Sequence, residues 1–259
     1  LYFPRLGFEV RPEEKALLRP DVRDPKARNI SLNVDGSLKG AAGDEATRSE
    51  VAAMVGRFRD QAVSLVTRLF PRYAEVMRLA PTSYRPMQVE TRTQSWRADD
   101  KRMHVDAFPS RPNYGERILR VFSNVNPTQP RVWRVGESFE DMARALLPRI
   151  KPPLPGSAAL LAALQVTKSV RSAYDHFMLG LHDSAKADLA YQRDCAQQTV
   201  EFAPGTTWLC FSDQVMHAAV SGQYMLEQTI HMPLSALYDR SRAPLAILER
   251  LTGRSLVAA

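Results

Sequence analysis

The sequence predicts an α+β fold with a double-stranded β-helix core, the jelly roll also found in cupins, flanked by helices. Short segments with period-two alternation form two clusters, which lie before and after a helical insertion at 137–191. No glycine-rich phosphate turn and no alternating strand–helix units occur, which excludes a Rossmann plan. No internal repeat is visible. We therefore expect one domain over residues 1–259.

The first half should contain a long helix followed by three strands. Leu1–Val10 is strand-like, and 35–50 has the composition of a flexible polar loop. Apolar residues recur on one helical face over Thr47–Phe70, and Pro71 suits the start of a second helix, Pro71–Leu79. Period-two segments then predict strands at 87–97, 101–107 and 117–126.

The second half should run from helices back to strands. We expect helices at Glu137–Leu147 and Ser157–Tyr191. A tail helix at Ala243–Thr252 should end at Gly253. Between them, turn residues separate four expected strands at 197–203, 206–212, 214–220 and 222–232.

The composition is that of a soluble globular protein, with 44% hydrophobic and 24% charged residues. No apolar run is long enough to span a bilayer. Two cysteines are too few for a disulfide framework or an all-cysteine zinc site, and they fit a reducing compartment. A net charge of +7 favours anionic partners or simple solubility. Nucleic acid is not favoured, because the arginines are scattered singly.

One His-x-Asp pair has the spacing of a metal site. His104 and Asp106 lie two apart on an expected strand, so their side chains should share one face. Iron(II) oxygenases use two imidazoles and one carboxylate, and leave the remaining positions open for co-substrate and O₂. His217, in the second strand cluster, is the candidate third ligand. The pair alone is a weak signal, because a surface His beside an Asp gives the same pattern.

The other histidines are poorer ligand candidates. His176 and His182 lie in a segment with helical apolar spacing, which favours packing, although substrate contact stays open. His231 ends a strand before Pro233, and we interpret it as structural.

A 2-oxoglutarate co-substrate would need a cation for its far carboxylate. In many such enzymes an arginine follows the distal histidine by about eleven positions, and here Gln228 stands there. Arg117 and Arg120, on the strand after Asp106, are the alternative cations. We favour Arg120 as the anchor with Gln228 as a hydrogen-bonding helper; the alternative for either arginine is an exposed strand residue.

Several long blocks resemble the Kdo 3-hydroxylases of Gram-negative bacteria. They are HVDAFPSRPNYGERILRVFSNVNP, YDHFMLGLHD and PGTTWLCFSDQVMHAAVSGQYMLEQT, with LYFPRLGF and ARNISLN near the N-terminus. The resemblance implies a dioxygenase using Fe(II), 2-oxoglutarate and O₂, with His104, Asp106 and His217 as iron ligands. It implies hydroxylation at C3 of the 3-deoxy-D-manno-oct-2-ulosonic acid (Kdo) of Kdo-lipid A, giving Ko, succinate and CO₂. Gln228 fits this family's own pattern.

The resemblance also explains the net positive charge of the chain, since Kdo-lipid A is an anionic glycolipid. Some of the cations that flank the site in sequence should meet its charges: Arg97, Lys101, Arg102, Arg111, Arg131 and Arg134. The implied location is cytoplasmic, peripheral to the inner membrane of a Gram-negative bacterium. Pro152–Leu164 is a candidate apolar contact, with a buried core helix as its alternative.

Two other functions stay open. One is an Fe(II)/2-oxoglutarate oxygenase that acts on a small metabolite or a protein side chain. The other is a non-catalytic, cupin-like module that binds a sugar or lipid. A complete set of His104, Asp106 and His217 favours an enzyme, because a binding module has no need of it. Oligomeric state does not follow from the sequence.

Overall fold

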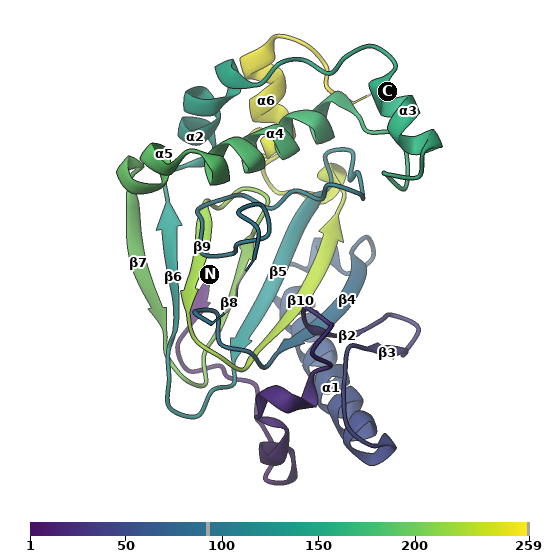
Figure 1. The fold of residues 1–259 in the computed structure, drawn as a ribbon, viewed down its shortest axis with the longest axis vertical. Helices are drawn as coiled ribbons and strands as arrows, with labels where there is room; N and C mark the ends of the chain where they lie inside the picture. The colour runs from purple at the N-terminus through teal and green to yellow at the C-terminus, as the bar shows by residue number, and fades with distance from the viewer. Residues whose placement is uncertain (92–93, 258–259) are drawn as a thin grey trace.

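The computed structural model describes residues 1–91 and 94–257 and contains two antiparallel sheets (Figure 1). The larger sheet has the order β1-β8-β5-β10-β4-β2-β3 and the smaller one β7-β6-β9. The strands of the larger sheet are Tyr2–Phe3 (β1), Thr207–Phe211 (β8), Arg117–Asn124 (β5), Met225–Met232 (β10), Arg78–Arg85 (β4), Ile30–Leu32 (β2) and Leu38–Lys39 (β3). Those of the smaller sheet are Gln197–Phe202 (β7), Arg131–Gly136 (β6) and His217–Ser221 (β9).

Aromatic side chains join the two sheets. Phe122 of β5 lies edge-on to Trp133 of β6, with ring centroids 5.0 Å apart. Trp208 of β8 stacks on Phe202 of β7 at 3.9 Å. Large rings bury much apolar area and hold fixed relative orientations, so this cluster sets how the sheets face each other.

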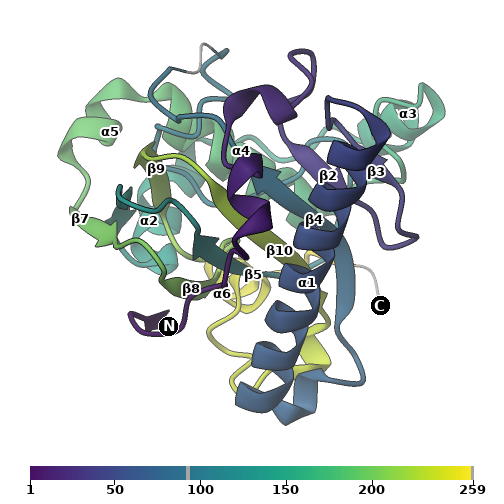
Figure 2. The same cartoon turned by 90° about the horizontal axis from the view of Figure 1, so that it is seen from below.

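The long helix α1 (Glu45–Leu69) covers the outer face of the larger sheet, as the view in Figure 2 shows. Asp44 begins it, because its carboxylate accepts a hydrogen bond from the Thr47 amide at 2.9 Å. Met54 and Phe58 lie on its buried face, in a core shared with Leu226 and Ile230 of β10. This core therefore belongs to the side of the sheet away from the smaller one.

The remaining helices gather over one end of the two sheets (Figure 1). They are α2 (Phe139–Leu146), α3 (Ser157–Ala163), α4 (Ala173–Ala187), α5 (Leu189–Asp194) and α6 (Pro244–Thr252). Short 3-10 helices occupy Glu13–Leu17, Pro20–Val22, Pro71–Tyr73, Leu147–Arg149 and Leu234–Ala236. In the part of the chain that the structure describes, no helix combines the length and apolarity needed to cross a bilayer.

The expected α+β class, with a two-sheet core flanked by helices, is confirmed. The long helix, the strand at 117–126 and the four C-terminal strands all form, and Gly253 ends α6 at φ +68°. The helical insertion lies between β6 and β7 as α2 to α5.

The expected helix at Pro71–Leu79 is wrong, since only a 3-10 turn forms before strand β4. Pro81 obscured this strand, because proline cannot donate to a ladder. The ladder between β4 and β10 shifts register between Gln228 and Ile230, opposite that part of β4. A bulge there accommodates a residue without an amide hydrogen.

Other boundaries also differ. The described residues of 87–97 form no strand, and 92–93 lie outside the described residues. In 101–107 only His104 pairs, through an isolated bridge. The expected Ser157–Tyr191 helix is divided into α3, α4 and α5, and the loop expected at 35–50 ends where α1 begins, at Glu45. Strand β6 was not expected at all.

Candidate metal centre

Side chains alternate across the segment that carries the His-x-Asp pair. Met103 and Val105 are buried in the core formed with α2, α4 and α6. His104 and Asp106 therefore face the opposite way, into a cavity of about 560 Å³. The two side chains share a face although the segment forms a single bridge and no full strand.

Backbone hydrogen bonds place the second histidine opposite the first. The His104 amide donates to the His217 carbonyl at 2.9 Å, and the His217 amide donates to the His104 carbonyl at 2.9 Å. The Asp106 amide donates to the Ser212 carbonyl at 2.8 Å. Paired residues of antiparallel strands carry their side chains on one face, so both imidazoles enter the same cavity.

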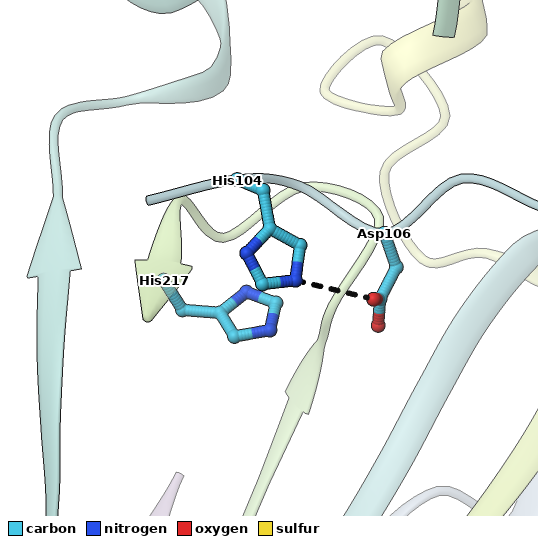
Figure 3. Close-up of side chains that lie close together, drawn as sticks. All are labelled: His104, Asp106 and His217. Carbon is cyan, nitrogen blue, oxygen red and sulfur yellow. Dashed lines mark ion pairs between the residues drawn. The ribbon is translucent and has the colours of Figure 1, made fainter. Parts of the chain in front are cut away.

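The three side chains point toward one another, as Figure 3 shows. Their ligand atoms lie within 4.8 Å of one another, and His104 Nε2 is 3.8 Å from Asp106 Oδ1. Each imidazole uses Nδ1 for a backbone carbonyl: His104 to that of Arg102 at 2.7 Å, and His217 to that of Val215 at 2.8 Å. A ring that donates through Nδ1 keeps the Nε2 lone pair for a metal, so these donors fit a divalent ion.

The electrostatics also suit a metal. Burial lowers the pKa of both imidazoles, so His104 and His217 are neutral at physiological pH. Burial alone would raise the pKa of the Asp106 carboxyl, but the Arg120 guanidinium beside it lowers that pKa well below its usual range. The cluster thus presents two neutral nitrogens and one carboxylate, the protonation states that a metal requires.

The metal-free protein should lose stability as the pH falls below the ordinary imidazole pKa of 6.5. Burial lowers the pKa of His104, His217 and His231, so below that pH the unfolded chain binds protons that the folded chain does not. The loss is at most about 1.4 kcal/mol per pH unit for each imidazole, and it fades as the pH rises above 6.5. Urea unfolding with a chelator, at pH values above and below 6.5, measures it. A midpoint unchanged on acidification would contradict these assignments.

A buried chain of charges continues from the cluster into the larger sheet. Arg120 Nη2 lies 3.0 Å from Asp106 Oδ2, and its Nη1 lies 3.0 Å from Glu227 Oε1. Arg85 Nη2 then lies 2.5 Å from Glu227 Oε2. Both guanidinium groups still have an Nε–H that is buried without a hydrogen-bond partner. Two guanidinium groups that line one cavity beside the carboxylate of the cluster give this part of its wall a cationic character that suits an anion.

The strand register separates the residues expected to bind the co-substrate. Arg120 and Glu227 line the cavity, whereas Gln228 is hydrogen-bonded to Thr82 and to the Ala80 and Thr229 carbonyls. Arg117 pairs with Asp213 at 2.7 Å and packs over a phenylalanine ring. Neither Arg117 nor Gln228 lines the cavity. Of the three residues expected to bind the co-substrate, only Arg120 therefore lies at the metal site.

The cations expected to meet the substrate have different positions. Arg97 and Arg131 line the metal cavity, and Arg111 lines an adjoining cavity of about 780 Å³ that shares Arg120 with the first. Arg102 lines neither, because it donates to the Lys186 carbonyl at 2.7 Å. Lys101 and Arg134 are joined by an Arg134 side-chain bond to the Lys101 carbonyl.

The remaining histidines are also placed. His182 lines the cavity, with its ring centroid 5.4 Å from that of His104 in an edge-on arrangement. His231 lines the adjoining cavity next to Phe108. His176 bonds to the Lys151 carbonyl away from the site.

Several residues that line the cavity were not predicted from the sequence, among them Arg85, Trp133, Lys186 and Glu227. Trp133 stacks on His217 with ring centroids 5.0 Å apart. The sequence did contain a sign of Glu227, because a glutamate inside the apolar strand MLEQTIHM is expected to be buried and to need a cationic partner. Arg85 was hidden by the incorrect assignment of β4.

Two facing antiparallel sheets that hold two histidines and a carboxylate around an open cavity are typical of the mononuclear non-haem iron oxygenases. The family model for 3-deoxy-D-manno-oct-2-ulosonic acid (Kdo) hydroxylase matches residues 1–255. The chain belongs to this family. A search of curated proteins finds no match.

Solved structures of the Kdo hydroxylase KdoO, a non-haem Fe(II) α-ketoglutarate-dependent dioxygenase, agree with this membership. The cobalt(II) complex is 43% identical, with a TM-score of 0.96 over 100% of this chain and 88% of that one. The complex with α-ketoglutarate and Fe(III) is 43% identical, with a TM-score of 0.94 over 99% and 87%. The complex with succinate and Fe(III) is 42% identical, with a TM-score of 0.95 over 100% and 87%.

Proposed function

We propose that this chain is an Fe(II)- and 2-oxoglutarate-dependent dioxygenase that hydroxylates the Kdo sugar of Kdo-lipid A at C3, giving Ko. The observation that carries the proposal is the cluster of His104, Asp106 and His217 at a cation-rich cavity, in a chain of the Kdo hydroxylase family.

The three ligands would be His104 Nε2, His217 Nε2 and an Asp106 carboxylate oxygen. Iron held there would supply the activation of O₂, driven by oxidative decarboxylation of 2-oxoglutarate. The chain's own part is orientation. Carbonyls fix both imidazole rings through Nδ1, and Arg120 fixes the carboxylate and keeps it ionised. Trp133 packs flat against His217 and restricts water on that side.

Arg120, assisted by Arg85, would hold the far carboxylate of 2-oxoglutarate. Both guanidinium groups have buried Nε–H donors without partners, and both line the metal cavity. Charge-assisted hydrogen bonds of this kind are stronger than neutral ones and give a carboxylate a fixed direction. Phe122 and Met225 lie on the same cavity wall and provide apolar contact for a short carbon chain.

The charge of the cavity supports an anionic substrate. Six cationic and four acidic side chains line it. A divalent metal and the dianionic co-substrate offset each other, so the surplus of two positive charges remains for a third component. An acidic sugar on an anionic lipid suits that surplus, whereas a neutral metabolite would not use it.

A purified enzyme given Fe(II), ascorbate and 2-oxoglutarate tests the proposal. With Kdo-lipid A, it should release succinate and add one oxygen atom to the Kdo residue, read by mass spectrometry. An oxygenase with another substrate would consume 2-oxoglutarate and leave Kdo unchanged. A non-catalytic binding module would retain the glycolipid and consume no 2-oxoglutarate.

The segment around α3 supports attachment to a membrane surface. The alternative of a buried core helix at Pro152–Leu164 is wrong, because α3 contains no buried residue, and Leu160 and Leu164 are 60% and 65% exposed. Residues 142–174 contain no acidic residue and five basic ones, Arg144, Arg149, Lys151, Lys168 and Arg171. Exposed leucines among lysines and arginines are typical of segments that bind anionic lipid surfaces.

This segment is also tied to the substrate side of the molecule. The Lys168 amide donates to the Ser110 carbonyl at 2.8 Å, and Tyr114 donates to Ser169 Oγ at 2.6 Å. Ser110 lines the cavity that adjoins the metal site. A glycolipid held in a bilayer could thus present its sugar to the site while its acyl chains stay near α3. We propose a cytoplasmic enzyme that binds the inner membrane peripherally in this orientation.

Introducing glutamates at α3 should weaken vesicle binding. The double variant Leu160→Glu, Leu164→Glu removes two apolar contacts, each worth about 1.5–3 kcal/mol if fully buried in lipid, and adds negative charge. Co-sedimentation with vesicles containing phosphatidylglycerol should therefore fall at least about tenfold. Leu189→Glu on α5, 66% exposed in the native chain, is the matched control. Equal losses for both variants would contradict the role of α3.

A further inference from the structure

One face of helix α4 forms a wall of the metal cavity. Leu179, His182, Asp183 and Lys186 all line it. Their spacing of three and four residues places them on one side of the helix. This wall therefore offers an imidazole, a carboxylate and an amine to whatever lies between α4 and the metal cluster.

Lys186 is the unusual member of this wall. Its side chain is only 2% exposed, and its Nζ donates to the Arg97 carbonyl at 2.9 Å. No carboxylate oxygen lies within 4 Å of Nζ in the residues that the structure describes. Two other cations of the cavity have carboxylate partners, since Arg97 pairs with Asp183 and Arg28 with Asp100.

A buried ammonium with no carboxylate in ion-pair contact is costly, and the more distant charges of Asp100 and Asp106 offset only part of that cost. Burial lowers the pKa of Lys186, which is the expected sign of this penalty. A mobile anion in the cavity would remove the penalty and supply hydrogen-bond acceptors for the remaining N–H groups. The position thus has the properties of a carboxylate or phosphate anchor.

The co-substrate already has an anchor of its own. The unused Nε–H donors of Arg85 and Arg120 belong to strands β4 and β5 of the larger sheet, whereas Lys186 extends from α4. Two separate cationic positions at one metal centre suit two separate anions. The second anion is then the substrate's.

We propose that Lys186 binds the carboxylate of the acidic sugar substrate, while His182 and Asp183 on the same wall bind its hydroxyl groups. This inference rests on the proposed function and adds the residues that would recognise the sugar. A carboxylate on Lys186 ties the sugar to α4 at one end. Neighbouring hydrogen bonds to hydroxyls then decide which carbon faces the metal, so Lys186 would be a specificity-determining residue.

Lys186 also has a structural contact, and the variants must separate the two roles. Lys186→Gln removes the charge and keeps an N–H donor that can reach toward the Arg97 carbonyl. Lys186→Met removes both the charge and the donor at similar length. Lys39→Met, at an exposed position on β3, is the matched control for loss of a lysine.

The test compares a synthetic Kdo glycolipid as the free acid with its carboxyl methyl ester. We expect the native enzyme and Lys39→Met to favour the acid by about tenfold to a hundredfold in kcat/KM, the range for a charge-assisted hydrogen bond. In Lys186→Gln and Lys186→Met the acid should lose this advantage while kcat/KM for the ester changes little. Lys186→Arg should recover part of the preference.

Several results would overturn the inference. A preference for the acid that survives in Lys186→Gln would show that the sugar carboxylate binds elsewhere. A rise in the KM for 2-oxoglutarate as large as that for the glycolipid would assign Lys186 to the co-substrate instead. Equal losses on acid and ester would indicate a structural role. A native enzyme that oxidises neither glycolipid would overturn the proposed function itself, and this inference with it.

Discussion

His104→Ala is expected to abolish iron retention and 2-oxoglutarate consumption. The variant removes one of the two imidazoles of the cluster, and no other histidine of the described residues belongs to it. Loss of residues that only orient metal ligands typically costs ten- to a hundredfold, so loss of a ligand should exceed about a hundredfold. Metal analysis after gel filtration and succinate release under saturating Fe(II) measure the two effects.

His176→Ala is the control for this variant, because His176 bonds to the Lys151 carbonyl and lies away from the cavity. The backbone bridge at residue 104 uses main-chain atoms only, so the Ala variant should keep its fold. Succinate release at the native rate by His104→Ala would refute the metal assignment.

Arg120→Met should raise the KM for 2-oxoglutarate strongly, by about tenfold to a hundredfold. The variant removes the proposed carboxylate anchor and also frees Asp106 and Glu227 from their shared cation. The KM of the variant for Kdo-lipid A should change much less. Steady-state kinetics with each substrate varied in turn give the comparison.

Arg117→Met is a matched control, because Arg117 is also a buried arginine of β5 with a carboxylate partner. Removing it leaves Asp213 buried and unpaired, which should cost about 3–5 kcal/mol of stability. Its KM for 2-oxoglutarate should nevertheless stay near the native value, since Arg117 does not line the cavity. If Arg117→Met alone raised that KM, the anchor would be assigned to the wrong arginine.

The most predictable feature of the site was the side of the strand on which each side chain lies. His104 and Asp106 share a face because side chains alternate along extended backbone, and this holds even where one bridge replaces a strand. The same rule separates Arg117 from Arg120, three positions apart on β5, and Gln228 from Glu227 on β10. Relating Gln228 to Arg120 also needs the register of β5 against β10, which pairs Arg120 with Thr229 and so leaves Gln228 on the other face.

The other features of the site depend on tertiary packing and could not be predicted from local sequence patterns. Strand β6 carries Arg131 and Trp133 on one buried face. Because a buried arginine interrupts the apolar–polar alternation, the sequence pattern did not predict this strand. Arg85 ends a strand that contains a proline tolerated at a bulge. Lys186 reads as an ordinary solvated helix residue, and only the packing of α4 over the cavity reveals that it is buried.

The reciprocal backbone bonds between His104 and His217 have a consequence for how the protein acquires its metal. The two ligands are joined by main-chain hydrogen bonds that need no ion, so the ion enters a frame that the fold has already built. Little of the free energy of metal binding would then be needed to order the chain. Zinc fingers differ, because they fold only around their ion. Chelation should leave both amide hydrogens protected from exchange with deuterated water. The same enzyme molecule could therefore lose and regain its metal repeatedly without passing through an unfolded state.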